Sequence, residues 1–542
     1  MTHSGLRWTH LRWILLFVAF FMHSLAVYQR GPLLGTDQGF QTGAARSLLQ
    51  GHGVSLPVFE ASDVSQPIYK PLYWWPPVYS FMAAGLMATI IDDPWWVTLL
   101  LTWLGMVILF AALFATLEML DLSAITKTAL WLYWTFIWPP IIVTDTTGPT
   151  DFLAAGFYAL GVTFALRSIS RQSGDLKWSV LAGAVVGFSA AIRYAYLPLI
   201  LVAPVAYVVY AFLQRGRRVV YSGALCLLSS VVFTLPTLLW QRAGGASETP
   251  AALLKRSEII VPSLLNIVPF PAMALGLGKS WTPASTDGIS LWVVSAVGLA
   301  VFVFTCGTHM IQIYRAARTH LPVPDTLCLF YCMGLLTIIV LPLTFAYLSA
   351  RTPEGSWTFV SETRYYTPTV GFLAVSLFAA ANGRYCVRRP SSVLVILFVA
   401  IVGIRVGVRE VKLWKDRLRA PFPAPGISLT KDYNWLFYTK LGELTSSGEA
   451  VGYLSTGKNN FYKGWAIVAG ASVYHSMDPI PFNPDTRLDA KRPVTLLVQI
   501  DRDGPDARSG VLKELVERPS TAFLGSTRAY DLYRIKLDGS HP

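Results

Sequence analysis

The sequence predicts a polytopic α-helical membrane protein that carries an extracytoplasmic α/β domain at its C-terminal end. Of 542 residues, 53% are hydrophobic and 14% are charged, and the mean hydropathy is +0.48, more apolar than is usual for a soluble domain. Apolar runs near 20 residues recur, which is the length that crosses ~30 Å of hydrocarbon as a helix. From about residue 410 the long apolar runs give way to polar sequence with short strand-like segments.

Eleven segments are expected to span the membrane. They are residues 12–29, 95–117, 126–144, 151–167, 178–193, 195–213, 219–240, 289–313, 326–349, 365–382 and 391–408. The first has a basic flank, Arg7 and Arg12, but no small-residue cleavage pattern follows it. We therefore interpret it as a retained helix and not as a removed signal peptide.

The apolar stretch Pro76–Ile91 is the ambiguous case, because it starts with two prolines and is short for a span. If it does not cross, the loops after the even-numbered spans lie on the same side as Arg7 and Arg12. Those loops hold eleven basic residues: Arg167, Arg171, Lys177, Arg215, Arg217, Arg218, Arg315, Arg318, Arg384, Arg388 and Arg389. The positive-inside rule then predicts a cytoplasmic N-terminus, an exterior C-terminus and a re-entrant or surface-lying helix over 76–91.

Two domains are predicted. Residues 1–409 form the membrane module, whose first exterior loop, 30–94, holds interfacial helices, and residues 410–542 form the exterior α/β domain. In the exterior domain we expect strands at Ala450–Ser455, Val494–Ile500 and Tyr530–Leu537, and helices at Tyr433–Leu444 and Val511–Val516.

Several functional classes are disfavoured. The net charge of +13 is largely assigned to cytoplasmic loops, where orientation and anionic lipid account for it, so no nucleic-acid partner is expected. The five cysteines fall in spans or in a cytoplasmic loop, which leaves no exterior disulfide framework. The run ending in Gly278-Lys279-Ser280 lacks the first glycine of a phosphate-binding loop, because Met273 stands there.

Two acids lie where helices begin on the exterior side. Asp37 follows the first span and opens a run that ends at Gln50-Gly51, and Asp151 opens the fourth span. Either acid could simply cap its helix by accepting backbone N–H bonds. The functional alternative is that a carboxylate at this boundary takes the proton of an incoming hydroxyl group.

Cations and aromatic residues gather at the same boundary. Lys70, Arg193 and Arg364 are candidates for binding a phosphate, and the alternative for each is that it reaches toward lipid headgroups. Tyr69, Glu362 and Tyr365 are candidates for a substrate pocket, although Glu362 could also pair with Arg364.

These residues resemble the GT-C glycosyltransferases, in particular the protein O-mannosyltransferases and the lipid A aminoarabinose transferases. The matching positions are Asp37, Gly51, Lys70-Pro71, Asp151 and Arg364-Tyr365, and the resemblance covers roughly residues 10–400. It implies transfer of a sugar from a polyprenyl-phosphate carrier, usually with inversion, outside the cytoplasm.

Carried over, the resemblance makes Asp37 the base on the acceptor hydroxyl, Lys70 the residue that holds the carrier phosphate, and Asp151 a residue that binds or orients acceptor or sugar. The chain departs from the family at two positions. Gln38 stands where the mannosyltransferases tend to have a second acid, and Tyr69 stands where the aminoarabinose transferases have a glutamate.

The sequence thus predicts an integral glycosyltransferase of a bacterial inner or plasma membrane, with a lipid, glycan or protein as acceptor. Whether a divalent metal assists the reaction is left open. Two alternatives remain: a non-catalytic binding or assembly protein that keeps the fold, and a transporter or flippase for lipid-linked sugars. Transporters tend to carry inverted repeats and charges near the bilayer midplane, whereas here the mid-span positions are nearly uncharged and no repeat is visible.

Overall fold

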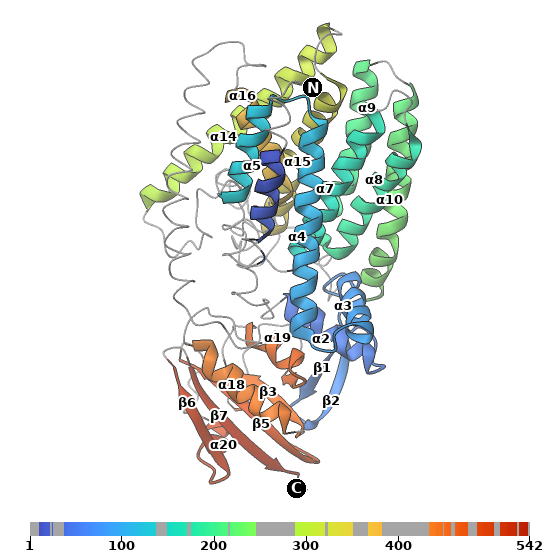
Figure 1. Ribbon diagram of the computed structural model, residues 1–542. Coiled ribbons are helices and arrows are strands. Elements are labelled where there is room, and N and C mark those ends of the chain that lie inside the picture. Colours follow the sequence, from blue (N-terminus) through green and yellow to red (C-terminus); the bar gives the residue numbers. More distant parts are fainter. Residues whose placement is uncertain are drawn as a thin grey trace. The chain divides into compact units, whose positions relative to one another are not determined.

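The computed structural model divides into two compact units (Figure 1). It describes residues 10–21, 24, 37–136, 149–170, 175–214, 217–244, 288–319, 324–350, 367–381, 433–447, 449–456, 461–474, 485–502, 510–527 and 530–539. The helical unit comprises Met1–Val27 and Thr102–Arg419, and the sheet unit comprises Tyr28–Leu101 and Ala420–Pro542.

Long apolar helices make up the helical unit. They are His10–Phe21, α4 (Pro94–Met119, which begins in the sheet unit), α5 (Ala124–Phe136), α7 (Pro149–Ser170), α8 (Leu176–Ile192), η1 (Tyr194–Leu201), α9 (Val202–Gln214), α10 (Arg217–Ala243), α14 (Gly288–Thr319), α15 (Asp325–Ala350) and α16 (Thr367–Ala381). Within the described ranges, six helical stretches are long and apolar enough to cross a membrane. These elements follow ten of the predicted spans, and the eleventh, 391–408, lies outside the described residues. The number of spans stays a prediction.

Small residues let the helices approach closely, as is typical of packing between membrane helices. A Cβ on Gly105 of α4 would lie 2.6 Å from the backbone nitrogen of Leu153 in α7. A Cβ on Gly183 of α8 would overlap the backbone carbonyl of Cys226 in α10. Serine and threonine hydroxyls bridge the same helices; Ser189 Oγ, for example, donates to the Ala154 carbonyl at 2.6 Å.

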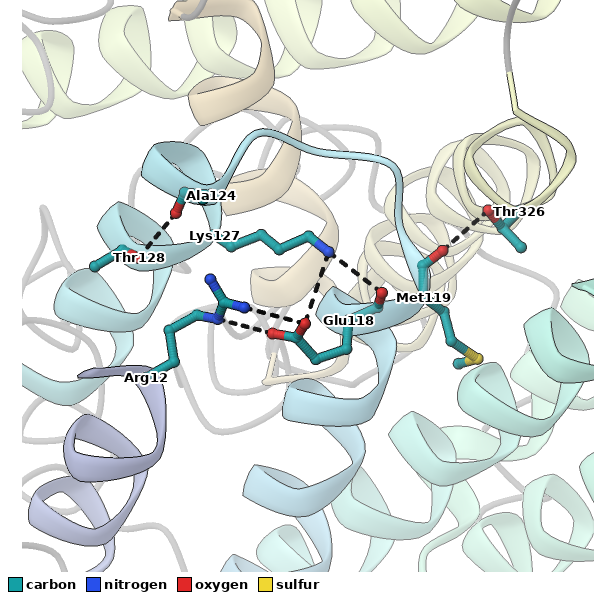
Figure 2. A network of polar contacts seen from close by, with 7 residues as sticks. All are labelled: Arg12, Glu118, Met119, Ala124, Lys127, Thr128 and Thr326. Atoms are coloured by element: carbon teal, nitrogen blue, oxygen red, sulfur yellow. Dashed lines mark hydrogen bonds and ion pairs between the residues drawn. The ribbon is translucent and has the colours of Figure 1, made fainter. Parts of the chain in front are cut away.

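A polar network ties together four helix ends in the helical unit (Figure 2). Arg12 Nε lies 2.8 Å from Glu118 Oε1 at the end of α4, and Lys127 Nζ of α5 lies 3.8 Å from Glu118 Oε2. Thr326 Oγ1, near the start of α15, donates to the Met119 carbonyl at 3.2 Å. The first helix and α4 therefore run antiparallel.

This antiparallel pairing bears on the segment 76–91. If both helices span, the chain between them makes no net crossing of the membrane. In that segment α3 (Val78–Thr89) has 12 residues, so it is about 18 Å long, shorter than the hydrocarbon core. Both observations agree with the predicted helix that does not cross. The compartment that each side faces stays a prediction.

The sheet unit contains a seven-stranded mixed sheet in the order β2-β1-β4-β3-β5-β7-β6. Its strands are β1 (Ser55–Glu60), β2 (Asp63–Pro71), β3 (Val451–Ser455), β4 (Ser472–Tyr474), β5 (Pro493–Asp501), β6 (Thr521–Ser526) and β7 (Tyr530–Asp538). The neighbours from β1 to β5 run parallel, while the β1–β2, β5–β7 and β6–β7 pairs are antiparallel. Its helices are α2 (Asp37–Leu49), α3, α18 (Tyr433–Ser446), α19 (Phe461–Val468) and α20 (Gly510–Val516).

The core of this unit follows from the strand patterns. Six consecutive residues of β5, 494–499, are buried, as expected for a central strand with both faces covered. Leu496 and Val498 pack there with Leu454 of β3 and Ile535 of β7. The residues of β6, an edge strand, are half-buried or exposed.

The segment predicted to be the first exterior loop contains strands as well as helices. Residues 55–71 form the β1–β2 hairpin, and Val58 of β1 pairs in parallel with Val473 of β4. The contacts therefore group residues 28–101 with 420–542, which differs from the predicted division at 409/410. A strand that pairs across some 400 residues leaves no local signature of its partner, so the sequence pattern did not reveal this grouping.

Candidate functional site

Asp37 is the first residue of α2, where the aligned peptide dipoles favour a negative charge. The helix ends as the sequence indicated. Gly51 has φ +85°, its N–H donates to the Leu48 carbonyl at 3.1 Å, and the His52 N–H donates to the Ser47 carbonyl at 2.9 Å. These two bonds form a Schellman motif, which requires the left-handed conformation that glycine adopts freely.

Buried contacts fix α2 within the sheet unit. Thr42 Oγ1 lies 3.4 Å from the Tyr79 hydroxyl and 3.3 Å from Thr98 Oγ1, and Ser80 Oγ donates to the Gln41 carbonyl at 2.9 Å. Because these groups come from α3 and from the first turns of α4, the backbone at Asp37 is held by two neighbouring helices.

Tyr69 and Lys70 are adjacent on β2, so they point to opposite faces of the strand. Tyr69 pairs with Pro57 and stacks on His52, with ring centroids 3.5 Å apart. Lys70 pairs with Leu56, is half-buried, and has no ion pair among the described residues. The sequence predicted that both residues contact substrate, but the structure does not place them on one face.

Asp151 and Arg193 form a buried ion pair in the helical unit. Asp151 lies in the first turn of α7, and Arg193 follows the last residue of α8. Arg193 Nη1 contacts Asp151 Oδ1 and donates to Thr150 Oγ1 at 3.2 Å. The Asp151 side chain is fully buried, and that of Arg193 is 10% exposed. Two charges are tolerated there because each neutralises the other.

From the sequence, these two residues were predicted to have separate roles, with Asp151 as a catalytic residue and Arg193 as a phosphate ligand. The structure instead makes them partners. Asp37, Tyr69 and Lys70 belong to the sheet unit, whereas Asp151 and Arg193 belong to the helical unit. Glu362, Arg364 and Tyr365 lie outside the described residues.

Sequence reasoning missed Arg46. It lies on α2, nine positions after Asp37, and its Nη1 donates to the Val468 carbonyl at 3.0 Å. The signal in the sequence was a single arginine on this helix. Nothing in the sequence showed that residues more than 400 positions later would contact it. Within the described ranges, no three His, Cys, Asp or Glu side chains gather as a metal site would require.

The structure is similar to the crystal structure of ArnT from Cupriavidus metallidurans bound to undecaprenyl phosphate. The similarity covers 98% of each chain, with a TM-score of 0.54 and 12% sequence identity. A weaker similarity joins it to the archaeal oligosaccharyltransferase AglB from Archaeoglobus fulgidus in complex with an inhibitory peptide and a dolichol-phosphate. That alignment covers 90% of this chain and 69% of the other, with a TM-score of 0.47 and 11% identity.

At the sequence level, no protein-family model and no curated protein matches the chain. The chain has the fold of the GT-C superfamily, to which ArnT belongs, and the predicted resemblance is confirmed at that level.

Proposed function

We propose that the chain is an integral membrane glycosyltransferase that moves a sugar from a polyprenyl-phosphate-linked donor to a lipid, glycan or protein acceptor on the extracytoplasmic face. The observation that carries the proposal is the similarity, over 98% of both chains, to a protein bound to undecaprenyl phosphate. The predicted topology accompanies it, with eleven spans, a cytoplasmic N-terminus and an exterior C-terminus.

In this proposal Asp37 is the general base. A carboxylate at the start of α2 accepts the proton of the acceptor hydroxyl as that oxygen attacks the sugar carbon. The carrier phosphate leaves from the opposite side, so the configuration at that carbon inverts. The rigid attachment of α2 supports the assignment, because a base is effective only when it is held in position.

Lys70 stabilises the departing phosphate. Negative charge grows on the carrier oxygen as the bond breaks, and a cation placed there lowers the barrier. Lys70 suits this role because no carboxylate among the described residues neutralises it. Arg364 is a second candidate from the sequence, with Glu362, Tyr365 and Tyr69 as candidates for contact with the sugar or acceptor.

The ion pair changes the roles proposed for Asp151 and Arg193. Because the Arg193 guanidinium is already paired with the Asp151 carboxylate, it attracts a phosphate less strongly than an unpaired arginine would. We therefore assign Arg193 the role of orienting Asp151. Asp151 then contributes to binding the acceptor or sugar through an oxygen that Arg193 holds in place.

The test is sugar transfer by the purified full-length protein in nanodiscs. A panel of radiolabelled polyprenyl-phosphate sugars is offered with membrane extract as acceptor. Asp37→Asn is compared with the wild type and with Asp92→Asn, which alters an exposed carboxylate on the loop before α4. We expect Asp37→Asn to lower transfer by about a hundredfold or more, with carrier binding retained, and Asp92→Asn to transfer normally.

Equal transfer by Asp37→Asn and the wild type would remove Asp37 from the role of base. Carrier binding without transfer from any donor would favour the non-catalytic binding protein or the flippase over the transferase.

A further inference from the structure

A cavity of about 160 Å³ with both polar and apolar lining residues lies inside the sheet unit, between α2 and one face of the sheet. One side of α2 lines it through Gly43, Arg46, Ser47 and Gln50, which are spaced three and four residues apart. The sheet lines it through Val64, Ser65, Pro67 and Tyr69 of β2 and through residues of β1, β3, β4 and β5. A cavity of this volume accepts a six-membered ring.

Among the described residues that line the cavity, Arg46 is the one that carries a charge, and none is a carboxylate. Its side chain is half-buried, and its Nη1 donates to the Val468 carbonyl at 3.0 Å. No ion pair to Arg46 occurs among the residues that the structure describes. A guanidinium in such a place keeps donors for an oxyanion, which it binds through charge-assisted hydrogen bonds.

The surrounding groups suit a polar ring. Ser47, which also lines the cavity, is 2% exposed and brings a hydroxyl group to the site. Gln50 and Pro67 are exposed, so the cavity opens to solvent beside them. The Tyr69 ring, stacked on His52, adds an aromatic wall. Aromatic walls with a few convergent polar groups are typical of sites for small molecules.

Arg46 lies in the last turn of α2, where the negative end of the helix dipole would repel an anion. Here that repulsion is weaker than at a free helix terminus. The carbonyls of Ser47 and Leu48 already accept N–H bonds from His52 and Gly51. Gly470, with φ +99°, lets its backbone lie against the guanidinium, since a Cβ there would be 3.2 Å from Arg46 Nη1. Arg46 is thus held between α2 and the turn after α19.

From this geometry we propose that the cavity binds an acidic sugar, a hexose-sized ring with one carboxylate or phosphate group, and that Arg46 holds the oxyanion. Tyr69 lines this cavity and Lys70 is not among the described residues that line it, and binding to the cavity needs neither donor nor carrier.

The experiment measures binding of four probes to the full-length protein in nanodiscs by saturation-transfer NMR: glucuronate, glucose 6-phosphate, glucose and inorganic phosphate. We expect at least one of the two acidic sugars to bind at least tenfold more tightly than glucose and than phosphate alone. Arg46→Gln should weaken that binding about tenfold or more. Arg487→Gln, which removes the same charge from an exposed arginine paired with Asp489, should leave it unchanged.

A second variant guards against misfolding of Arg46→Gln. Pro67→Trp places a large ring at the exposed rim, keeps Arg46, and should block the same probes. Equal binding by Arg46→Gln, equal binding of glucose or of inorganic phosphate, or no binding of either acidic sugar would each overturn the proposal. Since the assay contains no donor or acceptor, those results would leave the transferase proposal standing.

Discussion

Arg193, at the end of α8, pairs with Asp151, at the start of α7, and the carboxylate is fully buried. The pair joins the start of α7 to the end of α8, which are the ends of these consecutive helices opposite their connection. It explains how an acid and an arginine are both accommodated at the predicted membrane boundary, since a buried charge is costly unless a partner compensates it.

The first prediction concerns this ion pair. Asp151→Asn and Arg193→Gln should each lower the free energy of unfolding by about 3–5 kcal/mol, because either change leaves one buried charge alone. The double variant should lose less than the sum of the two, since no lone charge remains. Unfolding of the four proteins in one detergent gives the double-mutant cycle. Strictly additive losses would contradict the pairing.

The second prediction concerns Lys70. Lys70→Ala should weaken binding of the polyprenyl-phosphate carrier about tenfold or more, because a charge-assisted bond to the phosphate is lost. Lys491→Ala is the matched control, since Lys491 lies in the same unit, is 72% exposed and pairs with Asp63. Titration of the carrier into each variant gives the Kd. An unchanged Kd for Lys70→Ala would assign the phosphate to another cation.

The third prediction concerns helix packing. Gly183→Ala should destabilise the protein by about 1–3 kcal/mol, because the new methyl group would overlap the Cys226 carbonyl and push α8 from α10. Gly307→Ala in α14 is the control, as a Cβ there meets nothing within 4 Å and alanine favours a helix. The readout is the Tm in a fixed detergent. Equal Tm values for the two variants would show that α8 and α10 are not in close contact.

The fourth prediction concerns the network of Figure 2. Glu118→Gln should cost about 1–3 kcal/mol, because Arg12 and Lys127 lose the carboxylate that both contact. Arg12 is only 6% exposed at its side chain, so water replaces that partner poorly. Glu443→Gln breaks an exposed pair with Lys440 and should cost less than about 1 kcal/mol. A smaller loss for Glu118→Gln than for Glu443→Gln would argue against the network.

Local patterns were sufficient for several elements. Asp37 was expected where a helix begins, in a run that ends at Gln50-Gly51, and α2 begins at Asp37 and ends in a Schellman motif at Gly51. The predicted strands 450–455, 494–500 and 530–537 correspond to β3, β5 and β7. These features depend on residues close together in the chain, so a short stretch of sequence is enough to predict them.

Other features depend on distant residues. The hairpin of β1 and β2 was not predicted, because its place in the sheet is set by pairing with β4. The strands β4 and β6 were also missed: β4 has only three residues, and β6 is an edge strand whose residues are half-buried or exposed, so neither has a clear pattern of buried positions. The opposite orientation of Tyr69 and Lys70 likewise became apparent only once their segment was seen to be a strand.

By itself, the sequence was sufficient to predict a helical membrane protein with an α/β domain at its C-terminal end. Twenty-residue apolar runs must form helices in a membrane because every backbone polar group there needs an internal partner. Only the tertiary structure decided which charges meet. Asp151 and Arg193 are 42 positions apart, and Arg46 and Val468 are separated by 422 positions. Such contacts depend on how helices and strands pack, and packing is a property of surfaces that the chain acquires only when it folds.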